Sequence, residues 1–168
     1  TIIDNLGTIN NIVVYDASWY NDAVKDDGGY SLELINPNSP CGGGTNNWTA
    51  SSDVSGGTPG TQNSVYDVTP DVTAPDLVSI DVLSSNSILL NFSEPMDTTS
   101  VLSGVYSITG GLSVTSMNLY STDYSNLVLN LSAAIDTSIT YTVTTSTIID
   151  CSGNSISTNN SANFVIGY

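Results

Sequence analysis

The side chains of this sequence that could do chemistry are almost all carboxylates. Aspartate and glutamate number 16, against one basic residue, Lys25, and no histidine. Ser-His-Asp and Cys-His arrangements need a histidine, as do histidine-based zinc sites. Two kinds of chemistry therefore remain: acid–base catalysis by paired carboxylates, and binding of a hard cation such as calcium.

Three acids in a short central segment are candidate calcium ligands. Asp67, Asp71 and Asp76 follow one another at intervals of four and five residues. Carboxylate oxygens suit calcium, and such a set could clamp the ion between two domains and stiffen the joint. We expect no other cofactor.

Other acidic groups fit turns better than sites. The group Asp22, Asp26 and Asp27 beside Gly28-Gly29 does not have EF-hand spacing, and we interpret it as a solvated hairpin tip. The pair Glu94 and Asp97 suggests a glycosidase. However, Pro95 lies between them after a strand-like run, which favours a turn.

A third acidic turn is expected where Asp150 and Asn154 flank Gly153. No group of residues in the sequence assembles into a catalytic set, and we expect a protein that is not an enzyme.

Four aromatic residues could form a sugar-stacking platform: Trp19, Tyr20, Tyr30 and Trp48. Tryptophan is highly buried on average, so we expect Trp19 and Trp48 to be core residues. Tyr20 and Tyr30 are the better candidates for binding a ligand.

The two cysteines, Cys41 and Cys151, are 110 positions apart. They are either two free thiols or one disulfide between domains. Export from the cell would favour the disulfide, but bonding needs Cα atoms within about 7 Å of each other.

The net charge of −15 excludes several partners. Nucleic acids require Lys or Arg to displace counterions, and an anionic membrane surface would repel the chain. No run of about 18 apolar residues exists, so we expect no membrane insertion.

Alternation of apolar and polar residues predicts an all-β fold. One face collects Ile88, Leu90 and Phe92, and similar patterns run through 78–82, 127–131, 141–143 and 164–166. Such runs, separated by turn residues, are typical of an Ig-like β-sandwich.

The chain is expected to hold two modules joined by a short Pro/Asp-rich linker. The linker is residues 67–76, and residues 77–168 supply seven or eight strand-like runs, enough for one sandwich. Residues 1–66 offer fewer, near Ile2–Ile3, Ile12–Tyr15 and Ser31–Ile35, followed by a long Gly/Asn/Ser/Pro-rich stretch, 36–60.

Residues 1–66 resemble the C-terminal half of the bacterial lamin-tail domain. The resemblance is carried by the runs Tyr15–Trp19, Gly28–Cys41, Asn47–Asp53 and Gly56–Tyr66. It implies a small Ig-like sandwich. The opening strands of the family have no counterpart here, so this sandwich is expected to be incomplete.

Residues 71–168 resemble a bacterial Ig-like domain of S-layer and other surface proteins. The matching runs are Thr73-Ala74-Pro75, Asn91–Asp97, Thr140–Val143 and Asp150–Asn154. The resemblance implies an exported protein of the bacterial cell surface without a catalytic residue set.

These observations predict an extracellular structural or adhesive module of a bacterial surface protein or filament. Its expected partners are copies of itself or neighbouring domains, because a sandwich that lacks strands attracts a strand from elsewhere. The alternative is a carbohydrate-binding accessory module of a secreted enzyme, with glycans as partners.

Overall fold

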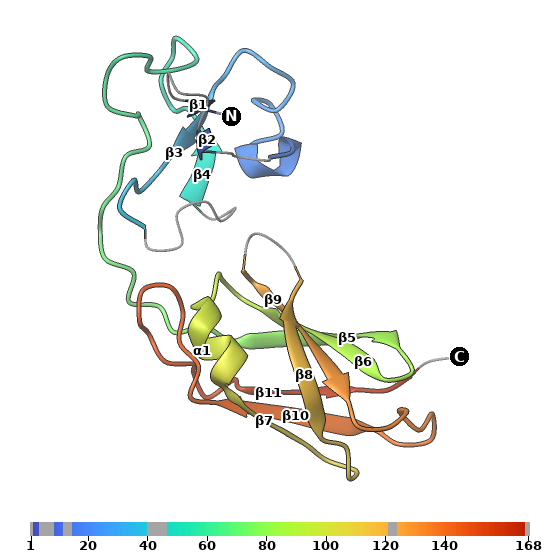
Figure 1. The fold of residues 1–168 in the computed structure, drawn as a ribbon. Helices are drawn as coiled ribbons and strands as arrows, with labels where there is room; N and C mark the ends of the chain where they lie inside the picture. Colours follow the sequence, from blue (N-terminus) through green and yellow to red (C-terminus); the bar gives the residue numbers. More distant parts are fainter. Residues whose placement is uncertain (1, 4–8, 12–14, 40–46, 121–123, 167–168) are drawn as a thin grey trace. The chain divides into compact units, whose positions relative to one another are not determined.

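The computed structural model describes residues 2–3, 9–11, 15–39, 47–120 and 124–166, with side chains from Tyr15 onward. The chain forms two compact units (Figure 1). Unit 1 comprises Thr1–Asn38 and Thr45–Val68, and unit 2 contains Thr69–Tyr168.

Unit 2 contains most of the regular structure of the chain. Its elements are β5 (Leu77–Ser84), β6 (Ser87–Phe92), α1 (Thr98–Ser103), β7 (Val105–Ile108), β8 (Val114–Leu119), β9 (Asn126–Leu131), β10 (Tyr141–Ser146) and β11 (Ser161–Phe164). One antiparallel sheet has the order β5-β6-β9-β8 and the other the order β11-β10-β7 (Figure 1). The all-β, Ig-like sandwich predicted from the sequence is confirmed.

The two sheets of unit 2 enclose a continuous apolar core. Ile88 and Leu90 are fully buried and Phe92 is 7% exposed, so the alternation in β6 identified the core face correctly. The opposing sheet contributes Tyr141 and Val143, which are also buried. Burial of this kind supplies the main favourable free energy of folding.

In β5 the predicted core face is wrong at one residue. The pattern placed Val78 with Ile80 and Val82, but Val78 is 62% exposed and Leu77 is buried instead. The pairing with β6 shifts register between Leu77 and Ser79, as at a β-bulge. Such a shift reverses the side to which the side chains before it point.

Unit 1 has far less regular structure. Its elements are β1 (Ile2–Ile3), β2 (Ile9–Asn11), the 3-10 helix η1 (Ala17–Tyr20), β3 (Leu32–Leu34) and β4 (Trp48–Ala50). The strands form two two-stranded sheets, β1-β2 and β3-β4.

Two of the three strands expected in unit 1 are present, at Ile2–Ile3 and within Ser31–Ile35. A strand was also expected at Ile12–Tyr15. Tyr15 is not in a strand, so the prediction is wrong there, and residues 12–14 lie outside the described residues. Strand β4 lies in the stretch that was expected to be a long loop.

The described part of unit 1 has almost no apolar core. Only Glu33, Ala50 and Ser51 are buried among its residues whose exposure is described, and Ala50 alone is apolar. The order of unit 1 must therefore rest on hydrogen bonds, which converge on Glu33 as described below.

Candidate functional site

Three carboxylates of unit 2 come together at the start of its sandwich. One oxygen each of Asp71, Glu94 and Asp150 lie within 4.8 Å of one another. Asp150 is buried, Glu94 is half-buried and Asp71 is exposed, so the cluster opens to solvent on one side. We call these three residues the carboxylate cluster.

Asp150 is fixed by the tight turn that follows it. Its Oδ1 accepts hydrogen bonds from the backbone N–H groups of Ser152 (2.8 Å) and Asn154 (2.7 Å), and its Oδ2 accepts one from Asn154 Nδ2 (2.8 Å). Gly153 in this turn has a φ of +91°, a conformation that glycine adopts without strain. The turn predicted around Asp150 is therefore present.

Asp71 is tied to the same turn from the linker side. Asn154 Nδ2 also donates to the backbone carbonyl of Asp71 (3.2 Å), and Asp71 Oδ1 accepts from the backbone N–H of Thr73 (2.9 Å). Downstream, Pro75 is buried and its carbonyl accepts from the backbone N–H of Ser157 (2.9 Å). The linker residues from Asp71 onward thus lie against the sandwich.

Glu94 lies in the turn after β6, beside the other two carboxylates. Burial raises the pKa of Glu94, and the negative charges of Asp71 and Asp150 act in the same direction, so that the pKa is about 7. The pKa of Asp71 is lowered, chiefly by the hydrogen bond from the backbone of Thr73. Glu94 is therefore the carboxylate that gains or loses a proton when the pH changes around 7.

The oxygen set of the cluster suits a calcium ion. Calcium takes oxygen ligands at about 2.3–2.6 Å, so two ligand atoms on one ion lie at most about 5 Å apart. The spacing within 4.8 Å meets this limit. A divalent cation would also neutralise the repulsion that raises the pKa of Glu94.

Of the three calcium ligands predicted from the sequence, only Asp71 belongs to the carboxylate cluster. The carboxylate of Asp76 accepts from the hydroxyl of Ser157 and from Asn159 Nδ2 (3.3 Å). The backbone N–H of Asp67 donates to the carbonyl of Ile35 in unit 1 (3.1 Å).

Sequence reasoning assigned Glu94 and Asp150 to turns and missed their proximity. Both do lie in turns, and residues 56 positions apart in sequence give no local signal of meeting. The isolated β-bridge between Met96 and Asp150 is what joins the two turns. Asp97, the other residue of the rejected glycosidase pair, caps helix α1, because its side chain accepts a hydrogen bond from the backbone N–H of Ser100 (2.7 Å).

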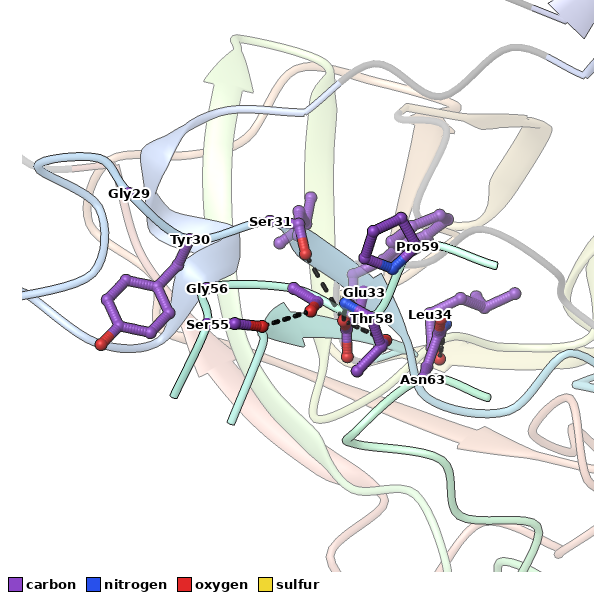
Figure 2. A pocket seen from close by; sticks show the side chains of 13 residues that line it. Gly29, Tyr30, Ser31, Glu33, Leu34, Ser55, Gly56, Thr58, Pro59 and Asn63 are labelled. Carbon is purple, nitrogen blue, oxygen red and sulfur yellow. Dashed lines mark hydrogen bonds between the residues drawn. The ribbon is translucent and has the colours of Figure 1, made fainter. Parts of the chain in front are cut away.

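Unit 1 carries a second feature, a groove beside strand β3. It has a volume of about 770 Å³ and is open to solvent. Figure 2 shows Tyr30 at one end, beyond Gly56, with Pro59 and Leu34 at the other end. Trp48 also lines it.

A buried glutamate holds the groove together. Glu33 Oε1 accepts from the backbone N–H (3.1 Å) and the hydroxyl (2.6 Å) of Thr58, and Oε2 accepts from the backbone N–H and the hydroxyl of Ser64 (both 2.8 Å). Burial alone would raise the pKa of Glu33, but these hydrogen bonds outweigh it and lower the pKa to about 2. Glu33 is therefore ionised and fully used as an acceptor.

The four aromatic candidates are all half-buried, so the expectation that Trp19 and Trp48 are core residues is wrong. The rings of Trp19 and Trp48 are tilted by 38° with their centroids 6.5 Å apart. The ammonium of Lys25 lies 5.1 Å from the centroid of the Tyr30 ring and donates to the carbonyl of Ser51 (2.9 Å). Tyr20 does not line the groove.

Cys151 is half-buried in the turn after Asp150. Cys41 lies outside the described residues, so the disulfide between Cys41 and Cys151 stays a prediction.

Comparison with known proteins identifies the family of the chain. The family model for the bacterial Ig-like domain matches residues 61–165. No curated protein matches the chain.

Among solved structures, the chain is similar to the S-layer protein rSbsC(31-844), at 20% identity and a TM-score of 0.48 over 57% of this chain and 14% of that one. It is also similar to domains 1-6 of the surface layer protein SbsC (20% identity, TM-score 0.48, 58% and 14%) and to the N-terminal part of SbsC (22%, 0.47, 55% and 24%). The chain thus spans 14% to 24% of the length of these proteins.

No helix within the described residues is long and apolar enough to cross a membrane. The match to residues 61–165 covers all of the sandwich of unit 2 from β5 to β11. This chain belongs to the bacterial Ig-like domain family.

Proposed function

We propose that the chain is a non-enzymatic structural module of a bacterial surface protein, in which the carboxylate cluster binds calcium and fixes the linker to the sandwich. The observation that carries this proposal is the position of the cluster. Asp71 comes from the linker, whereas Glu94 and Asp150 come from two turns of the sandwich. A cation held by all three would resist separation of these segments.

Membership of the bacterial Ig-like family supports a structural role and a location outside the cell. The composition agrees, since a chain with one basic residue and a charge of −15 suits neither nucleic acids nor anionic membranes. Immunogold electron microscopy of intact producing cells tests the location. We expect label at the cell surface, and label confined to the cell interior would contradict the proposal.

We further propose that unit 1 is a lamin-tail-like sandwich completed by a strand from elsewhere, either from another copy or from another segment of a longer parent protein. Its described sheets have two strands each, and two-stranded sheets are marginally stable alone. Leu32, Leu34 and Trp48 share one face of the β3-β4 sheet and remain half-buried. A further strand paired to the edge of β4, away from the groove beside β3, would widen this sheet.

Sedimentation and hydrogen exchange of the 168-residue chain separate the possibilities. Completion in trans, as in an adhesive filament, predicts association that increases with protein concentration and with salt, because salt screens the repulsion between chains of charge −15. Completion by another segment of the parent predicts a monomer with fast-exchanging amides in β3 and β4. A monomer in which these amides exchange slowly would contradict both.

The alternative, a carbohydrate-binding accessory module of a secreted enzyme, is favoured by one observation, the groove lined by Tyr30 and Trp48. A binding groove in unit 1 is compatible with a structural role for unit 2.

A further inference from the structure

We propose that the groove of unit 1 binds a neutral oligosaccharide. The groove runs between β3 and the loop of residues 55–59, as Figure 2 shows. Ligand sites are commonly about 300–1,000 Å³, and this groove of about 770 Å³ is of that size. The groove is open to solvent, so a ligand could enter it without a movement of the chain.

The groove offers apolar faces of the kind that pack on sugar rings. Tyr30 lies at one end, Leu34 and Pro59 at the other, and Trp48 contributes to the lining. Tyrosine and tryptophan combine a large apolar ring with a polar group, which suits ligands that are apolar on one side and hydroxylated at the edge.

The groove also offers hydrogen-bonding groups that its own fold does not fully use. Backbone hydrogen bonds join the two strands at Ser31 and at Ile35, and Glu33 pairs with Thr49 midway between them. Bonded and non-bonded positions alternate in an antiparallel pair, so the backbone N–H groups of Leu32 and Leu34 point away from β4. The indole N–H of Trp48 is buried and has no hydrogen-bond partner within the described structure. An unpaired buried donor is costly, and a small rotation of the Trp48 ring would be needed for an oxygen atom of a ligand to satisfy it, because the nitrogen is closed to solvent.

Charge determines the class of sugar. Glu33 is the only charged residue among the described residues that line the groove, and its oxygens already accept five hydrogen bonds, from Ser31, Thr58 and Ser64. The ammonium of Lys25 lies over the Tyr30 ring, but it is already engaged with the carbonyl of Ser51 and the carboxylate of Asp22. A carboxylate or sulfate group of an acidic polysaccharide would therefore meet no free cation in the lining, and the net charge of −15 would repel it. Uncharged hydroxyl groups carry no such penalty.

The walls of the groove are held in place before any ligand arrives. Glu33 ties β3 to Thr58 and Ser64, the side chain of Asn63 donates to the carbonyl of Leu34 (2.9 Å), and the N–H of Ser31 donates to the carbonyl of Gly56 (2.7 Å). A preformed site avoids the entropy cost of ordering loops on binding.

The test uses the indole N–H signals in nuclear magnetic resonance spectra of the whole chain, which has only two tryptophans. Trp19→Phe assigns the signal of Trp48. The probes are cellohexaose, xylohexaose, mannohexaose and chitohexaose, each added up to about 10 mM to detect even weak binding. We expect at least one to shift the Trp48 signal and the amides of residues 32–34 and 55–58 saturably.

Matched variants show whether the groove is responsible. Tyr30→Ala should weaken binding about tenfold or more, corresponding to the loss of one good contact. Tyr30→Phe should retain binding, which would show that the ring matters and that the fold persists. Tyr120→Ala, at an exposed tyrosine of unit 2, should change nothing.

Three results would overturn the proposal. One is that no neutral probe shifts the Trp48 signal. Another is that binding occurs but Tyr30→Ala leaves its affinity unchanged. The third is that only a charged control, hexalysine or hexagalacturonate, produces the shifts, which would make the groove a site for a basic peptide or an acidic polysaccharide.

Discussion

Replacing Glu94 with glutamine should make unit 2 more stable at pH 8 and leave its stability nearly unchanged at pH 5. The folded protein raises the pKa of Glu94 from 4.5 to about 7. The folded state therefore binds this proton more tightly than the unfolded chain does. As a result, the contribution of Glu94 to stability is greatest below pH 4.5, falls between about pH 4.5 and 7, and stays low above that.

The size of the effect follows from the pKa difference. A change of about 2.5 in pKa corresponds to at most about 3.4 kcal/mol. Glu94 is only half-buried, and solvent screening reduces this to about 1–2 kcal/mol. For a domain of this size, each 1 kcal/mol shifts the melting temperature by about 4–8 °C.

Calorimetry at the two pH values, in the presence of a chelator, measures the difference. Asp81→Asn is a matched control, because it removes the same charge at an exposed position where the new side chain can still accept from Asn91 Nδ2. This variant should lack the pH-dependent gain. Equal stability of Glu94→Gln and the parent chain at pH 8 would refute the raised pKa of Glu94.

The Glu94→Gln variant also tests whether the carboxylate cluster binds calcium. At a calcium concentration about 100-fold above the dissociation constant, mass action adds about 2.7 kcal/mol to the stability of the parent chain. Glu94→Gln should gain less, because one ligand charge is lost. If calcium changes neither melting temperature, the cluster is a proton site only.

Three further predictions concern two single side chains and the cysteine pair. Phe92→Ala should destabilise unit 2 by about 3–5 kcal/mol in urea denaturation, as for other buried aromatics, and a loss below about 1 kcal/mol would contradict its place in the core. Glu33→Gln should loosen residues 55–64 and speed their amide exchange, since an amide group offers one acceptor oxygen where the carboxylate offers two; unchanged exchange would contradict the role of Glu33. Thiol titration of the denatured, unreduced chain should find no reactive thiol, as the predicted disulfide between Cys41 and Cys151 requires, and two reactive thiols would contradict that disulfide.

Strand patterns with a buried face could be predicted from the sequence. The alternation of Ile88, Leu90 and Phe92 is regular because β6 lies in the middle of its sheet and has one core-facing side. The same logic failed at Val78 in the edge strand β5, where a register shift interrupts the period of two. A register shift of this kind cannot be predicted from the types of the residues around it.

The organisation of unit 1 and the carboxylate cluster could not be predicted for a different reason. Strand β4 has three residues, too few for a periodic signal, and it is held by pairing with β3. Glu94 and Asp150 each fit a turn locally, and only the tertiary fold brings the turns together. The residues 150–154 correctly predicted a turn, but they gave no indication that Asp150 lies near Glu94, 56 positions away in the sequence.

The position of the one ammonium group has a consequence for proteolysis. An enzyme that cleaves after basic residues has a single possible site in this chain, the bond after Lys25. That residue lies within unit 1, and its side chain, which the protease must draw into its specificity pocket, is engaged with the carbonyl of Ser51 and the ring of Tyr30. The exposed segment 67–74 between the units, where proteases would otherwise cut most readily, offers no such bond. Trypsin-like enzymes outside the cell would therefore leave the two units joined.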